Sequence, residues 1–213
     1  MISQIIKDLY EEYKFKNILF VRTCTTGKWL DDIILNDKND IERILYYTDN
    51  IRQPQNSHIS TKIIHSNELE NLLLSFEKTY DLICVDCWHE YDKAKKDFEL
   101  LTSLLNDSGI LISHDCYPWK KQVSSPFYIQ GQWCGETYVA FTELSYKNQD
   151  IFFCNLNIDT GIGIASKIKF GNFLTNDIDR NKQEIFLEMH KNKEDVYEYF
   201  IKNSKEIINS ISK

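Results

Sequence analysis

Glycine and proline are scarce in this sequence, with 7 glycines and 3 prolines among 213 residues. Long flexible linkers are rich in such residues, so we do not expect any here. No apolar run reaches the roughly 20 residues that cross a bilayer, and residues 1–8 lack the apolar core of a signal peptide. The net charge of −7 argues against nonspecific binding to a nucleic-acid backbone. We therefore expect a cytoplasmic protein without a membrane or nucleic-acid partner.

The length and the 42% hydrophobic content suffice for one sizeable core, but not for two comfortable domains. We predict one domain over residues 1–170 and a helical extension over residues 171–213. The extension carries an apolar stripe that consists of Val196, Phe200, Ile207 and Ile211. The stripe packs either on the same domain or on a second copy in a homodimer, and the sequence leaves both alternatives open.

Six cysteines raise the question of a zinc site, because Cys84 and Cys87 form a Cys-x-x-Cys pair. Most of this pair lies in a predicted strand, where positions three apart point to opposite faces. No second Cys-x-x-Cys or His-x-His pair accompanies it. We therefore interpret the cysteines as buried free thiols in a reducing compartment.

The strongest signal in the chain is a pair of short apolar runs that each stop at an acid. Residues 82–85 end at Asp86, and residues 110–113 end at His114 and Asp115. Runs of this kind are typical of strands buried on both faces. Between them, apolar residues recur at helical spacing, namely Ala94, Phe98, Leu101 and Leu105, and Gly109 is placed to end the helix.

A strand, a helix and a strand in succession predict two parallel strands with a right-handed crossover. Asp86 and Asp115 should then lie at the same carboxyl edge of the sheet, where open α/β folds bind their ligands.

Two motifs at these strand ends resemble class I S-adenosylmethionine-dependent methyltransferases. Asp86-Cys87-Trp88-His89-Glu90-Tyr91 and His114-Asp115 resemble a subgroup whose fourth strand ends in Asp-x-x-His-x-Tyr and whose fifth ends in His-Asp. The first motif is also similar to catechol O-methyltransferases, which read Asp-x-Trp-Lys there. The resemblance implies a Rossmann-like α/β fold. Its mostly parallel sheet has seven strands with the last one antiparallel, and helices cover both faces.

The resemblance also implies that S-adenosylmethionine lies along the loop after the first strand, on Thr23, Cys24 and Gly27. The family normally has an acid and several glycines around this loop. Here Phe20 stands in the place of the acid and Arg22 in that of the first glycine.

Three further residues match positions that contact the cofactor in the family. Asp49 follows the second predicted strand and is expected to bind the ribose, although an aspartate can also simply start a turn there. Ser66 is a candidate for contact with the adenine, and Asp86 is a further cofactor-binding candidate.

His89 occupies the position of the lysine base of catechol O-methyltransferases. A neutral imidazole can accept the acceptor's proton, but a histidine here can instead cap the following helix. His114 and Asp86 are the other catalytic candidates. Asp86 and Asp115 together can bind Mg²⁺ or, without a metal, orient a substrate hydroxyl.

The expected acceptor is a small polar molecule. Residues 117–133 form a long loop above the carboxyl edge, which is typical of a substrate lid. Residues 133–136 and 159–161 resemble segments of members that act on sugars or on precursors of surface polysaccharides. We therefore expect an O- or N-methyltransferase acting on a sugar or sugar nucleotide. The altered loop at Phe20 and Arg22 favours the alternative, a non-catalytic or repurposed Rossmann-like protein.

Overall fold

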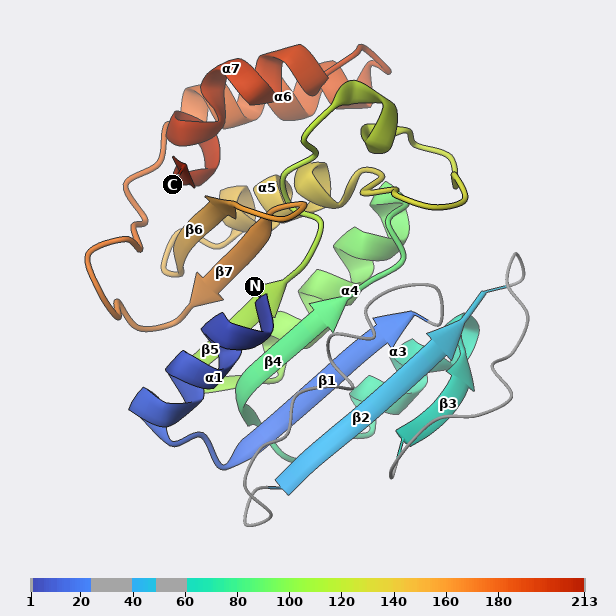
Figure 1. The fold of residues 1–213 in the computed structure, drawn as a ribbon, viewed down its shortest axis with the longest axis vertical. Coiled ribbons are helices and arrows are strands. Elements are labelled where there is room, and N and C mark those ends of the chain that lie inside the picture. The colour runs from blue at the N-terminus through green and yellow to red at the C-terminus, as the bar shows by residue number, and fades with distance from the viewer. Residues whose placement is uncertain (1, 24–39, 49–60, 213) are drawn as a thin grey trace.

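A computed structural model describes residues 2–23, 40–48 and 61–212 (Figure 1). Within these ranges the helices and strands follow each other as in a Rossmann-like domain. The helices are α1 (Ile2–Tyr13), α3 (Ser66–Leu74), α4 (Tyr91–Ser103), the 3₁₀ helix η1 (Lys121–Ser124), α5 (Thr137–Lys147), α6 (Arg180–Lys191) and α7 (Tyr197–Ile208). The strands are β1 (Asn17–Thr23), β2 (Asp40–Tyr47), β3 (Thr61–His65), β4 (Tyr80–Asp86), β5 (Leu105–Ser113), β6 (Phe152–Asn157), β7 (Ile162–Ser166) and β8 (Ser210–Ser212).

The strands form one sheet in the order β3-β2-β1-β4-β5-β7-β6-β8. Strands β1 to β5 pair parallel with one another, whereas β7 runs antiparallel to both β5 and β6. The predicted mostly parallel sheet with an inserted antiparallel strand is therefore confirmed. The short strand β8, which pairs parallel with β6, adds an eighth strand that the sequence analysis did not predict.

Strand β8 also corrects the predicted apolar stripe of the C-terminal segment. Asn209 ends α7 in the left-handed conformation, and its side-chain amide donates to the carbonyl of Phe153 at 3.0 Å. The chain therefore leaves the helix before Ile211, which lies in β8 and packs against the opposite core from Phe200 and Ile207.

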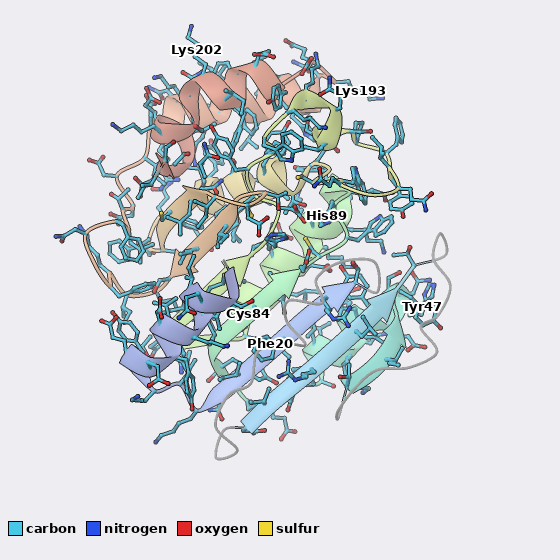
Figure 2. The ribbon with its side chains drawn as sticks, viewed as in Figure 1. Phe20, Tyr47, Cys84, His89, Lys193 and Lys202 are labelled. Atoms are coloured by element: carbon cyan, nitrogen blue, oxygen red, sulfur yellow. The ribbon has the colours of Figure 1, made fainter. Side chains whose placement is uncertain are left out.

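The sheet separates two apolar cores, because successive residues of a strand point to opposite faces. In β4, Leu82 and Cys84 belong to the core that α1 covers, whereas Ile83 and Val85 belong to the core under the helices of the other face. Cys84 pairs in register with Phe20 of β1 (Figure 2). Cys87 lies in the other core, so the two members of the Cys-x-x-Cys pair are on opposite sides of the sheet, as predicted.

Helices α4 and α5 pack side by side, and α6 and α7 stack on α5 at the end of the sheet farthest from β3 (Figure 1). Gln183 of α6 is fully buried and holds this arrangement together. Its side-chain amide donates to the carbonyl of Ile207 at 2.7 Å and to the hydroxyl of Ser145 at 3.1 Å. The C-terminal segment therefore packs on its own chain, while a homodimer stays a prediction.

The segment 106–109 does not terminate α4 as predicted, because the helix already ends at Ser103 and these residues belong to β5. The pairing of β4 with β5 is irregular at this point, between Tyr80 and Leu82. A Cβ on Gly109 would come within 2.9 Å of the Tyr80 carbonyl oxygen. Gly109 thus allows a close approach of two strands instead of releasing a helix.

In the part of the chain that the structure describes, no helix combines the length and the apolar character that crossing a membrane requires.

Candidate active site

Polar side chains converge where β4 and β5 end. Val85 pairs in register with Ser113, so Asp86 and His114, the next residues of the two strands, are neighbours at the carboxyl edge. Asp115 has a left-handed backbone, with φ of 59°, which turns the chain away from the sheet. Such a conformation is uncommon outside glycine and is enriched at functional positions, where the surrounding structure enforces it.

His114 is the cation at the centre of this cluster. Its Nδ1 lies 3.2 Å from Asp115 Oδ2 and 3.8 Å from Asp86 Oδ2. Its Nε2 lies 3.4 Å from Asp159 Oδ2 and 3.1 Å from the hydroxyl of Thr160. The segment Asp159 to Gly161, singled out in the sequence, therefore closes over the imidazole from the β6–β7 turn.

The close carboxylates change the ionisation of the cluster. Burial alone would lower the pKa of His114, but Asp115, Asp159 and Asp86 outweigh it and raise the pKa from 6.5 to about 11. Burial likewise would raise the pKa of Asp115, but His89 and His114 lower it from 3.8 to about 2. At neutral pH the cluster therefore holds an imidazolium between ionised carboxylates.

His89 lies against Asp115 and is 1% exposed. Its Nε2 is 3.2 Å from Asp115 Oδ2, a contact close enough for electrostatic attraction but without the alignment of a hydrogen bond. Its Nδ1 is 3.0 Å from the hydroxyl of Thr137. The ring packs edge-on against Trp133, with centroids 5.1 Å apart. His89 does not cap α4, whose N-cap is Glu90 and has no side-chain capping bond.

Three residues that the sequence analysis did not assign to the site, Gly135, Glu136 and Thr137, hold His89 from the start of α5. The backbone N–H of Glu136 donates to the His89 carbonyl at 2.7 Å. Gly135 makes this contact possible, since a Cβ there would lie 2.2 Å from the same carbonyl oxygen. The sequence similarity noted for residues 133–136 pointed to this segment, but not to its contact with His89.

A buried network supports the segment between Asp86 and His89 from below. The hydroxyl of Tyr46 donates to Asp97 Oδ2 at 2.7 Å and accepts the backbone N–H of Trp88 at 2.6 Å. Burial raises the pKa of Asp97 from 3.8 to about 7, against the opposing effect of the Tyr46 hydrogen bond. The network connects β2, α4 and the loop after β4.

Aromatic side chains of the loop 117–133 cover this edge of the sheet. The ring of Tyr128 stacks on Trp88 with centroids 5.3 Å apart, and Trp133 packs edge-on against both. Tyr128 and the neighbouring Phe127 are exposed. The loop therefore packs aromatic rings against the site and also exposes apolar side chains to solvent.

The predicted cofactor residues are only partly within the described ranges. Thr23 is fully buried at the end of β1, and Ser66 is the first residue of α3, partly exposed. Cys24, Gly27 and Asp49 lie outside the described residues.

Phe20 and Arg22, which replace the acid and first glycine of the family, are both found in β1. Phe20 is buried in the core, and its ring centroid lies 4.5 Å from Cζ of the Arg43 guanidinium. Phe20 therefore serves the packing of the core. The side chain of Arg22 donates to the carbonyl of Thr23 at 3.1 Å.

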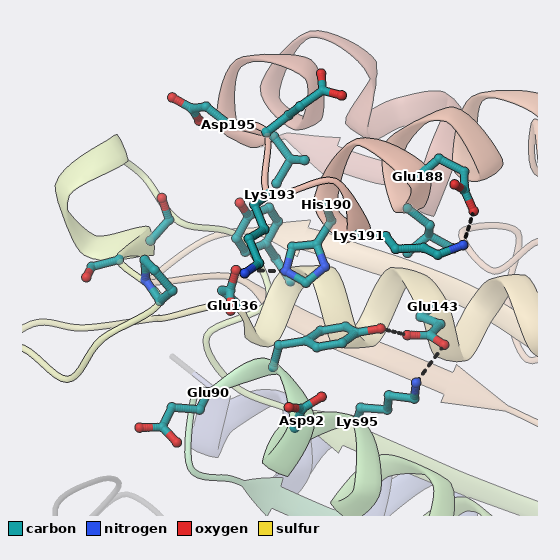
Figure 3. A pocket seen from close by; sticks show the side chains of 18 of the residues that line it. Glu90, Asp92, Lys95, Glu136, Glu143, Glu188, His190, Lys191, Lys193 and Asp195 are labelled. Carbon is teal, nitrogen blue, oxygen red and sulfur yellow. Dashed lines mark hydrogen bonds and ion pairs between the residues drawn. The ribbon is translucent and has the colours of Figure 1, made fainter.

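A groove of about 1400 Å³ lies beside the site, between α4, α5, α6 and the loop carrying η1 (Figure 3). Its charged side chains largely pair with each other. Tyr91 donates to Glu143, which also pairs with Lys95 at 3.1 Å, and His190 pairs with Glu136 at 2.8 Å. Because Glu136 also contacts His89, the groove begins next to the carboxyl edge.

Asp86, His114 and Asp115 are also the residues that fit a metal ion. One ligand atom from each lies within 4.8 Å of the others, and Asp86 and Asp115 are buried. Two carboxylates and one imidazole suit a divalent cation, which would displace a proton from His114 on binding. Among the residues that the structure describes, the buried thiols do not form such a group. Burial raises the pKa of the described cysteines that lie nearest, Cys87, Cys116 and Cys134, which keeps them protonated.

The sheet order, the antiparallel strand β7 and the polar cluster at the carboxyl edge define a Rossmann-like fold of the methyltransferase type. Residues 22–116 match the model of a family described as a methyltransferase domain. Over these residues, which include β2 to β5 and the cluster at the carboxyl edge, the chain is similar to methyltransferases. No curated protein matches the chain.

Solved structures share the fold at low sequence identity. A Staphylococcus aureus protein, named as a candidate caffeoyl-CoA O-methyltransferase, is 22% identical with a TM-score of 0.51, over 78% of this chain and 82% of that one. The O-methyltransferase TomG from Streptomyces achromogenes, involved in tomaymycin synthesis and solved with S-adenosylmethionine, is 13% identical with a TM-score of 0.51, over 77% and 78%. A candidate O-methyltransferase from Klebsiella pneumoniae is 14% identical with a TM-score of 0.50, over 77% and 78%.

Proposed function

We propose that this chain transfers the methyl group of S-adenosylmethionine to a hydroxyl of a small polar acceptor, such as a sugar or sugar nucleotide. An amine is the alternative acceptor group. The observation that carries the proposal is the cluster of Asp86, His114 and Asp115 at the carboxyl edge, with His89 behind it. Buried charges at this density are costly unless they serve a ligand or each other, and this edge is where the fold binds ligands.

Asp115 is the member of the cluster suited to receive the acceptor. Its lowered pKa keeps the carboxylate ionised, so it can accept a hydrogen bond from the acceptor hydroxyl and orient an oxygen lone pair. As the oxygen attacks the methyl carbon and the carbon–sulfur bond breaks, the oxygen gains positive charge and its proton becomes strongly acidic. Even a weakly basic carboxylate can take that proton and pass it to solvent.

His89 was predicted as the base, and its place in the structure supports a role through Asp115. Both ring nitrogens already face protein groups, Asp115 and Thr137, and the side chain is 1% exposed. An acceptor could reach the ring only by displacing one of these groups. His114 has its charge balanced by three carboxylates, so we assign it to holding the cluster together.

If the site takes Mg²⁺ or another divalent cation, Asp86, Asp115 and His114 would hold it. Such an ion would bind acceptor oxygens and favour their deprotonated form. Without it, the His114 imidazolium supplies the positive charge that balances the two carboxylates.

The groove beside the site supports a polar acceptor of more than minimal size. Its walls present Tyr91 and Glu143 in hydrogen bonds and ion pairs, so they offer polar groups of both charge signs. Aromatic faces together with paired polar groups suit a sugar, whose rings have both an apolar face and hydroxyl groups.

The test is calorimetric titration with S-adenosylhomocysteine, followed by transfer of labelled methyl from S-adenosylmethionine to a panel of sugar nucleotides. We expect binding, and labelling that Asp115→Asn abolishes. Absence of binding would overturn the proposal and favour the repurposed protein that Phe20 and Arg22 suggest. Binding without labelling of any sugar nucleotide would overturn only the acceptor class.

A further inference from the structure

Thr137 and His89 make a buried polar contact between two segments far apart in the sequence. The Thr137 hydroxyl lies 3.0 Å from Nδ1 of His89, and the two side chains are 0% and 1% exposed. Among the described residues, no other hydrogen bond is found for this hydroxyl. Because both groups are buried, one hydrogen bond should join them, and its proton comes either from the Thr137 hydroxyl or from Nδ1 of His89.

The other ring nitrogen decides the direction of that proton. Nε2 of His89 is 3.2 Å from a carboxylate oxygen of Asp115. An ionised carboxylate only accepts hydrogen bonds, so a bare Nε2 would turn a lone pair toward a negative charge. The proton of the neutral ring therefore belongs on Nε2, Nδ1 is left as an acceptor, and the Thr137 hydroxyl must donate to it.

The start of α5 is built so that Thr137 stays in this position. The preceding residue, Glu136, donates its backbone N–H to the His89 carbonyl at 2.7 Å, and Gly135 has no Cβ to block the approach. Glu136 is in turn paired with His190 of α6 at 2.8 Å. Backbone and side chain of His89 are thus held by consecutive residues of one rigid element.

We propose that Thr137 is a positioning residue: its hydroxyl donates to Nδ1 of His89 and so directs the Nε2–H toward Asp115. The Nε2–H and the Asp115 carboxylate then attract each other electrostatically across 3.2 Å. The effect of Thr137 on turnover rests on the proposed function, whereas the tautomer of His89 is a property of the protein alone.

The experiment is two-bond ¹H–¹⁵N NMR of the full chain labelled with [¹⁵N]histidine, which reports for each ring which nitrogen carries the proton. His89→Gln identifies the His89 signals among the five histidines. In the unaltered protein at pH 8 we expect a single tautomer of His89, with the proton on Nε2. Thr137→Val, of similar shape but without the hydroxyl, should lose this single tautomer, and Thr137→Ser should restore it.

Three results would overturn the proposal: a proton on Nδ1, protons on both nitrogens, or a Thr137→Val spectrum equal to that of the unaltered protein. Should Thr137→Val not fold, the unaltered protein and Thr137→Ser still decide between the tautomers. Titration with S-adenosylhomocysteine runs in parallel as a separate test. Its failure with the expected tautomer present would count against the proposed function and leave the role of Thr137 intact.

Discussion

The hydroxyl of Tyr46 donates a 2.7 Å hydrogen bond to the carboxyl group of Asp97, and both side chains are buried. The same hydroxyl accepts the backbone N–H of Trp88, next to His89. The end of β2, the helix α4 and the loop after β4 therefore share one network. A change in the charge of Asp97 acts directly on the segment that leads into the site.

Asp97 should make the protein less stable as the pH rises from about 4 to 7. Burial raises its pKa in the folded chain to about 7, whereas an unfolded aspartate titrates near about 3.9. Between these values the folded state binds a proton that the unfolded state lacks, so unfolding is increasingly favoured as the pH increases. Asp97→Asn cannot ionise and should lose this contribution. The measurement is urea unfolding of both proteins at pH 5 and pH 8.

The comparison is made as a difference between the two proteins, because the other titrating groups are common to both. Asp115, for example, has a lowered pKa and contributes the opposite slope, with stability lost as the pH falls through its folded pKa of about 2. Equal pH dependence in the two proteins would show that Asp97 is not protonated in the fold.

Gly135→Ala should destabilise the protein more than Gly131→Ala, although both glycines have a positive φ. The new methyl at position 131 meets nothing within 4 Å, so only backbone strain of about 1–2 kcal/mol is expected. At position 135 it would approach the His89 carbonyl oxygen to 2.2 Å, adding about 1–3 kcal/mol of overpacking. Thermal unfolding of the pair measures the difference, and equal losses would refute the close contact.

His89→Ala should lower methyl transfer strongly while leaving the affinity for S-adenosylhomocysteine unchanged. If His89 acts as a base or holds the proton acceptor, a loss of roughly 10²- to 10⁴-fold in turnover is expected. Single-turnover rates per folded molecule, measured beside melting temperatures, separate this from a loss of stability. A variant of normal rate and lower melting temperature would leave His89 with a structural role only.

Asp49→Ala should weaken binding of S-adenosylhomocysteine by roughly 1–3 kcal/mol, as expected for lost charge-assisted hydrogen bonds to the ribose. Glu184→Ala, an exposed change on α6, is the matched control and should bind normally. Calorimetry measures both. An unchanged affinity of Asp49→Ala would leave this aspartate as a turn residue.

Metal dependence is tested by removing divalent cations. If Asp86 and Asp115 hold Mg²⁺, turnover should fall in excess chelator and return when Mg²⁺ is restored. Asp159→Asn is the control variant. Asp159 pairs with Nε2 of His114 and is not one of the three residues that would hold the ion. If the chelator leaves turnover unchanged, the His114 imidazolium alone balances the charge of the two carboxylates.

The sequence alone was informative wherever the relevant pattern is local. The apolar run before Asp86 and the one before Asp115 predicted two parallel strands, and the chain direction then required both acids at one edge. The opposite placement of Cys84 and Cys87 followed from strand geometry in the same way. These predictions depend on the alternation of neighbouring residues, which the backbone of a strand imposes whatever packs on it.

The environment of His89 depended on tertiary structure, because its partners are distant in the sequence. Thr137 is 48 residues away, and Gly135 and Glu136 come from the same helix start. No periodicity links these positions. Their contact is created when α5 packs against α4, and only then does Nδ1 of His89 acquire its hydrogen-bond partner.

Gly109 and Ile211 are two further positions where packing overrides the local sequence pattern. A glycine after a helical pattern usually ends the helix, yet here it permits the close approach of β5 to Tyr80. Ile211 continues a helical spacing in the sequence, yet β6 offers an open edge that pairs with residues 210–212. The sequence by itself determined the fold class and which strand ends carry acids. The pairing of His89 with Thr137 and the eighth strand were decided by tertiary contacts, since a long-range partner can override a local preference.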